Sequence, residues 1–75
     1  MGNATLRYDE ERLLRWIRLC EEEGRGLPDI GQFSEAERNA LRRLIRKGLV
    51  QTEKGYWPYG TYGTKRTTFY RTVAG

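Results

Sequence analysis

Apolar residues recur at helical spacing across residues 34–50, and the sequence indicates both where this helix begins and where it ends. Ser34 is followed three positions later by Glu37, the pattern of a capping box in which each side chain bonds the other residue's backbone amide. Gly48 comes just after the last periodic residue, where a Schellman ending needs a left-handed residue. The pattern predicts a helix over residues 34–47.

This helix is predicted to have two contrasting faces. The apolar side chains share one face: Ala40, Leu41, Leu44 and Ile45. The opposite face carries mainly arginines: Glu35, Asn39, Arg42, Arg43 and Arg46. A short helix with a row of arginines suits the major groove of DNA, and it equally suits an ordinary solvated surface.

A first helix is predicted near the N-terminus, after a flexible tail over residues 1–7. Asp9 is a plausible N-cap, and the helix runs to about Glu23, with Gly24 as its stop. Cys20 is expected to be a small core residue rather than a reactive thiol. The inner stripe of the helix, with Leu14 beside it, contains Leu13, Trp16, Ile17 and Cys20.

The connector between the two helices contains a second, shorter signal. Leu27 and Pro28 precede Asp29, and this segment can open a single helical turn because proline is accepted at the first helical position. Ile30 and Phe33 would then point into the core.

After Gly48 the pattern changes from helical spacing to strands. Residues 49–53 and 65–73 are rich in Val, Thr, Tyr and Phe, which favours two strands. The segment between them contains several glycines and is expected to form the tip of a long hairpin, over residues 55–64. Two helices followed by a hairpin predict a single domain of the α+β class.

Composition excludes several classes of function. The chain of 75 residues has no histidine and one cysteine, so it lacks the commonest general base and metal ligand and cannot form an intramolecular disulfide. No phosphate-binding motif or activated nucleophile is found, so we expect neither an enzyme nor a cofactor or metal. A single unpaired cysteine fits a reducing cytoplasm, and no apolar run is long enough to cross a membrane.

Charge is distributed unevenly along the chain. The total is +4, but residues 1–33 hold five basic and seven acidic side chains, whereas residues 34–75 hold nine basic and three acidic ones. A positive half of this kind suggests binding to a polyanion, and the alternative is a solvated basic surface with no partner.

Over roughly residues 9–73 the chain resembles the winged helix-turn-helix family, most specifically in its C-terminal half. The resemblance lies in a helix that ends ALRRLIRKGLV, over residues 40–50, and in a basic hairpin whose return strand reads KRTTFYRTV, with Tyr70-Arg71 near its end. It implies a small winged-helix domain with two main helices, a short helical turn and a C-terminal hairpin. The chain departs from the family in its second helix, which is usually about two turns long and is here reduced to residues 28–33.

The resemblance also implies a DNA-binding surface, with residues 34–47 as the recognition helix in the major groove and residues 51–72 as the wing. Four residues would then lie near base edges: Glu35, Arg38, Asn39 and Arg42. Five others would contact the backbone: Arg43, Arg46, Lys47, Lys65 and Arg66.

The predicted hairpin tip is unusually aromatic. Tyr59 and Tyr62 are candidate contact residues, because aromatic rings beside cations can stack on bases or pack against sugars. Trp57 is expected to cover the small core instead, as cross-strand aromatic pairs do. A tip of this kind can equally bind a protein, since Tyr, Trp and Arg dominate binding hot spots.

Two hypotheses of function follow. The first is a double-stranded DNA-binding protein with some sequence preference, such as a small transcriptional regulator or a phage or plasmid accessory factor. The second is a winged-helix adaptor or inhibitor that binds a protein through its aromatic wing and charged helix faces. RNA remains a further polyanion partner, and specific binding by so small a domain would favour a homodimer on two half-sites.

Overall fold

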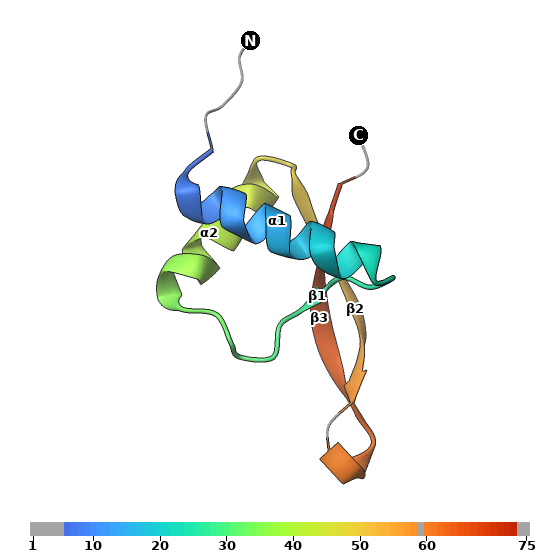
Figure 1. The fold of residues 1–75 in the computed structure, drawn as a ribbon. Helices are drawn as coiled ribbons and strands as arrows, with labels where there is room; N and C mark the ends of the chain where they lie inside the picture. The colour runs from blue at the N-terminus through green and yellow to red at the C-terminus, as the bar shows by residue number, and fades with distance from the viewer. Residues whose placement is uncertain (1–5, 59, 74–75) are drawn as a thin grey trace.

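The computed structural model describes residues 6–58 and 60–73, in which two helices cross one end of a long hairpin (Figure 1). In Figure 1, helix α1 passes in front of α2 and of the sheet, and the hairpin projects beyond both helices. The elements in chain order are α1 (Tyr8–Glu22), β1 (Leu27–Pro28), α2 (Glu35–Arg46), β2 (Val50–Pro58), the 3₁₀ turn η1 (Gly60–Tyr62) and β3 (Thr64–Thr72). The expected α+β class is confirmed.

Helix α2 begins and ends as its sequence predicts. The Ser34 hydroxyl accepts a hydrogen bond from the Glu37 amide at 3.2 Å, and the Glu37 carboxylate accepts one from the Ser34 amide at 2.8 Å. At the other end, Gly48 has a φ of 80°, and the Leu49 amide donates to the Leu44 carbonyl at 3.0 Å. These contacts satisfy backbone groups that a helix end leaves unpaired.

Helix α1 ends close to the predicted residue but begins earlier than predicted. Arg7 is the N-cap, so the assignment of Asp9 to that position is wrong. The Arg7 amide donates a hydrogen bond to the Glu10 carboxylate at 3.0 Å, and Glu10 is the third residue of the helix. Gly24 follows the helix with a φ of 90°. Residues 1–5 of the expected tail lie outside the described residues, and Leu6 packs against the core.

The core lies between the two helices and the end of the sheet that they cover. Its buried side chains are Leu13, Leu14, Ile17, Cys20, Leu27, Phe33, Ala40, Leu41, Leu44, Val50 and Tyr70. Cys20 is therefore a core residue, as expected. Trp16 and Ile45 are exposed at the edges of their helices, so their assignment to the inner faces is wrong. Trp16 still contacts the core through the edge of Phe33, with ring centroids 5.6 Å apart.

The connector forms a strand where a helical turn was expected. Leu27 pairs with Tyr70 and Pro28 with Phe69, which places β1 on the free edge of β3 in an antiparallel sheet of order β1-β3-β2. A Cβ on Gly26 would lie 2.8 Å from the Tyr70 carbonyl oxygen, so only glycine lets the backbones approach this closely. Proline suits such an edge strand, since it has no amide to donate.

The segment after β1 turns Ile30 away from the core and returns to it only at Phe33. The Asp29 amide donates to the Thr68 carbonyl at 2.8 Å, and Gly31 has a φ of 84°. Phe33 is buried as expected, but Ile30 is 51% exposed, so its assignment to the core is wrong. The segment that replaces a second helix is therefore an irregular turn fixed to the edge of β3.

Strand β2 is longer than the sequence indicates, because it continues through the glycine-rich segment to Pro58. Gly55 fits inside the strand because the Phe69 ring lies over it, and a Cβ there would be 2.8 Å from Phe69 Cε1. The glycine thus marks a close approach within the sheet rather than a turn. The expected tip over residues 55–64 is correspondingly shortened.

Candidate nucleic-acid interface

The outer face of α2 carries exposed polar side chains, as its sequence predicts. Glu35, Asn39, Arg42 and Arg46 are all exposed. Within the described part of the chain, Asn39, Arg42 and Arg46 form no side-chain hydrogen bond or ion pair. These groups are therefore available to an external ligand.

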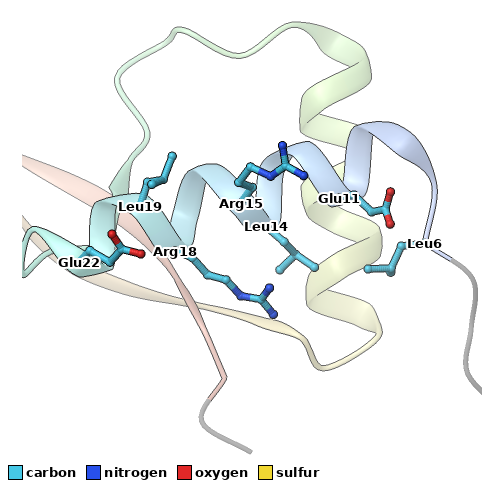
Figure 2. Close-up of a pocket in the computed structure, with 7 residues that line it drawn as sticks. All are labelled: Leu6, Glu11, Leu14, Arg15, Arg18, Leu19 and Glu22. Carbon is cyan, nitrogen blue, oxygen red and sulfur yellow. The ribbon is translucent and has the colours of Figure 1, made fainter.

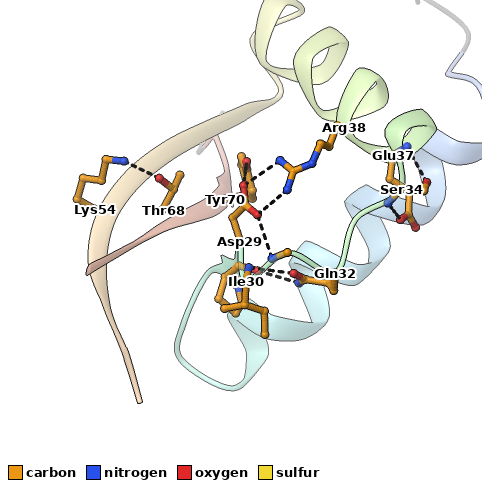
Figure 3. Close-up of polar contacts among 11 residues, drawn as sticks. Asp29, Ile30, Gln32, Ser34, Glu37, Arg38, Lys54, Thr68 and Tyr70 are labelled. Carbon is orange, nitrogen blue, oxygen red and sulfur yellow. Dashed lines mark hydrogen bonds and ion pairs between the residues drawn. The ribbon is translucent and has the colours of Figure 1, made fainter. Parts of the chain in front are cut away.

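Arg38 is different from its neighbours on α2, because its guanidinium is held by Asp29 (Figure 3). Its Nη1 and Nη2 atoms each lie 3.3 Å from an oxygen of the Asp29 carboxylate. The same carboxylate accepts a hydrogen bond from the Tyr70 hydroxyl at 2.9 Å. Asp29 thereby joins the connector, α2 and β3.

The protonation states of this cluster follow from its surroundings. Burial acts to raise the pKa of Asp29, but hydrogen bonds from Tyr70 and Arg38 outweigh it and hold that pKa below its ordinary value. Burial and the hydrogen bond to Asp29 raise the pKa of Tyr70 to about 12. At neutral pH the cluster therefore contains one carboxylate, one guanidinium and a neutral phenol.

Arg43 and Lys47 were expected to meet DNA phosphates, but both turn inward to Glu10 on α1. Arg43 Nε lies 2.6 Å from one Glu10 oxygen and Lys47 Nζ lies 2.9 Å from the other, while Arg43 Nη2 lies 3.3 Å from Asp9. Glu10 has no exposed surface. Its burial acts to raise the pKa of Glu10, but hydrogen bonds from Arg43 and Lys47 prevail and lower it to about 2. These two cations are committed to an internal ion cluster.

The strand register separates the two expected cations of the hairpin. Lys65 and Arg66 are consecutive in β3, so they point to opposite faces of the sheet. Arg66 is paired with Tyr56, and the next pair along that face joins Lys54 to Thr68. This is the face on which Tyr70 lies, toward α2.

Lys54 is a basic residue of this face that the sequence did not single out. Its Nζ donates to the Thr68 hydroxyl at 2.6 Å, and no carboxylate among the described residues pairs with it (Figure 3). The alternation of β2 would have identified it, but only once the strand was known to continue past Glu53. The pairing of β2 with β3, which the sequence does not give, was needed to place Lys54 on this face.

The opposite face of the hairpin is aromatic. Trp57 and Phe69 have ring centroids 6.2 Å apart, and the Arg25 guanidinium lies 5.0 Å from the centre of the Trp57 ring. Trp57 is half-buried and covers Phe69 on the sheet, away from the main core. Tyr59 and the side chain of Tyr62, the expected tip contacts, lie outside the described part of the structure.

A hollow with a volume of about 390 Å³ lies along α1 (Figure 2). Its lining mixes apolar and charged side chains: Leu6, Glu11, Leu14, Arg15, Arg18, Leu19 and Glu22. Residues 6–58 and 60–73 contain no group of three or more side chains that could hold a metal ion. Over the same residues, no helix has the length and apolar surface needed to cross a bilayer.

Comparison with known proteins adds no assignment. No family model, curated protein or solved structure matches the chain. Any function must therefore follow from the side chains that the fold leaves available.

Proposed function

We propose that the protein binds double-stranded DNA, with α2 in the major groove and the β2–β3 hairpin as the wing of a winged-helix domain. One observation carries the proposal. On α2 and the β2–β3 hairpin, four exposed cations have no carboxylate partner among the described residues: Arg42, Arg46, Lys54 and Arg66. The two helices and the long antiparallel hairpin are compatible with such a domain.

Three of the four cations are related through Tyr70, and Arg46 follows Arg42 by one turn of α2. Arg42 is close enough to influence the pKa of Tyr70 electrostatically, and Lys54 and Arg66 project from the face of the hairpin to which Tyr70 belongs. A positive surface made from a helix and a hairpin can follow two neighbouring stretches of phosphate.

The chemistry of α2 supports reading of bases as well as contact with phosphates. With 12 residues α2 is about 18 Å long, at about 1.5 Å per residue. The major groove of DNA is wide enough to admit an α-helix. Asn39 and Arg42 are one turn apart on the exposed face of α2. Asparagine pairs bidentately with adenine, and arginine pairs bidentately with guanine. Arg46, Lys54 and Arg66 supply phosphate contacts in this arrangement.

The number of contacts gives the strength of the salt dependence. On a duplex of random sequence Arg42 has no preferred base and contacts phosphate as well, so four cations on phosphates correspond to a slope of log K against log salt of roughly −3.6, at about −0.9 per phosphate. We expect this slope from fluorescence anisotropy with a labelled random-sequence duplex.

The test compares Arg42→Ala and Arg46→Ala with Arg18→Ala, an exposed arginine on the outer side of α1. Each α2 variant should weaken binding and reduce the steepness of the slope by about 0.9, while the α1 variant changes neither. Unchanged affinity in folded Arg42→Ala and Arg46→Ala would refute the assignment of α2 to the groove. An RNA duplex of the same sequence, measured in parallel, distinguishes the two polyanions.

A protein-binding adaptor or inhibitor is the second candidate. It is favoured by aromatic side chains on both faces of the hairpin, since Tyr56 is 68% exposed on the face of Lys54 and Arg66, and Trp57 is half-buried beneath Arg25 on the opposite face. Aromatic and arginine side chains of this kind dominate protein-binding hot spots. Under this alternative, Tyr56→Ala should abolish capture of a protein partner from nuclease-treated lysate, and Arg42→Ala should leave that capture intact.

A further inference from the structure

Asp29 connects three parts of the fold that are distant in sequence (Figure 3). Its carboxylate accepts from the Arg38 guanidinium on α2 and from the Tyr70 hydroxyl on β3, and its own amide donates to the Thr68 carbonyl. The Asp29 side chain is only 19% exposed. It therefore has a fixed position, with its negative charge directed at one cation of α2.

That cation belongs to the surface proposed to bind DNA. Arg38 precedes Arg42 by one helical turn, so the two side chains emerge on the same side of α2. The Arg38 side chain is 43% exposed, and its guanidinium lies 6.0 Å from the centre of the Phe33 ring. It sits at the boundary between the exposed face of α2 and the connector.

A phosphate cannot take Arg38 without depriving the Asp29 carboxylate of the cation with which it forms an ion pair. The Asp29 carboxylate is mostly buried, and removal of one partner from a buried charge pair leaves the other charge poorly solvated. Arg42 and Arg46 have no such internal competitor among the described residues. Contact with DNA through these two residues therefore requires no internal ion pair to break, whereas contact through Arg38 does.

We propose that Asp29 is a positioning residue that withholds Arg38 from DNA. The inference rests on the proposed function and concerns how that surface is tuned. With Arg38 neutralised, α2 makes fewer contacts that are independent of sequence, and base contacts by Asn39 and Arg42 account for a larger share of binding. Asp29 thereby favours specificity over general affinity for duplex DNA.

The test measures the salt dependence of binding to a random-sequence duplex. Asp29→Asn keeps an oxygen that can accept from Tyr70 but removes the charge that holds Arg38. We expect tighter binding and a slope steeper by about 0.9, so that the gain over the unmodified protein is about 3.5 times larger near 50 mM than near 200 mM salt. Arg38→Gln should leave the slope of the unmodified protein unchanged, because that arginine is already withheld.

The matched controls separate this mechanism from general effects of charge and folding. The double variant Asp29→Asn with Arg38→Gln should return to the original slope. Glu22→Gln on the outer side of α1 raises the net charge equally and should not steepen the slope. Tyr70→Phe removes a hydrogen bond to Asp29 but leaves the ion pair, so it should affect thermal stability without altering the slope.

Two results would overturn the inference. One is an unchanged slope in Asp29→Asn that is folded by circular dichroism. The other is a flatter slope in Arg38→Gln alone, which would mean that Arg38 already binds phosphate; this variant remains decisive even if Asp29→Asn does not fold. Failure of the proposed function is seen separately, since the unmodified protein would then show no binding even at low salt.

Discussion

The buried carboxylate of Glu10 provides the sharpest test of what holds the two helices together. Glu10 has no exposed surface and accepts bonds from the Arg43 guanidinium, the Lys47 ammonium and the Arg7 amide. Glu10→Gln conserves the shape of the side chain and can still accept a hydrogen bond. It removes the negative charge from between two cations, which is a costly change in a desolvated place.

The size of the effect follows from the pKa of Glu10, which is lowered from 4.5 to about 2. A depression of this size corresponds to about 3.5 kcal/mol of stability at neutral pH, at about 1.4 kcal/mol per unit. The Arg43 and Lys47 side chains are 29% and 31% exposed, so solvent screens part of the attraction. We therefore expect Glu10→Gln to lose about 2 kcal/mol, or about 10 °C in melting temperature for a domain of this size.

The loss should depend on pH in a defined direction. A carboxyl whose pKa is lowered by folding contributes its stability above the pKa of the unfolded chain, and this contribution disappears as pH falls through the folded value. The difference between the unmodified protein and Glu10→Gln should therefore be full at pH 7 and shrink from about pH 5 toward pH 2.

Urea unfolding followed by far-ultraviolet circular dichroism measures this difference at each pH. Glu11→Gln is the matched control, because Glu11 is the next residue of α1 and is exposed. It should change stability by less than about 0.5 kcal/mol, as is usual for surface substitutions. An equal loss for Glu10→Gln at pH 7 and at pH 3 would refute the reasoning, since it would show that shape rather than charge carries the effect.

Two further substitutions test the local structure. Ser34→Ala removes the acceptor for the Glu37 amide and should lower the free energy of unfolding by about 1 kcal/mol, as measured in urea. Ser34→Asp should stay close to the original stability, because it restores an N-cap acceptor. If Ser34→Ala is as stable as the unmodified protein, the cap contributes nothing. Gly55→Ala should destabilise by about 1–3 kcal/mol because its methyl group would meet the Phe69 ring, although alanine has less freedom to lose on folding than glycine. A gain in melting temperature for Gly55→Ala would contradict the close approach.

The sequence by itself determined the elements whose signals are local. The capping box and Gly48 define α2 because their hydrogen bonds join residues within one turn, and Gly24 ends α1 for the same reason. The apolar spacing identified most of the helix core, and the exposed polar face of α2 followed from the same period. Its errors at Trp16 and Ile45 lie at the margins of the two stripes, where the angle between packed helices decides burial.

Only the tertiary structure decided which charges are available. Glu10 is separated by 33 residues from Arg43, and Asp29 by 41 residues from Tyr70, so no local pattern indicates these pairings. Strand β1 exists because β3 offers it an edge, and Lys65 and Arg66 are separated by the pleat of a strand whose length was not evident from its glycines. Spacing along the chain shows on which face of its own helix or strand a side chain lies. Whether an arginine there meets solvent or a carboxylate depends on the element packed against it.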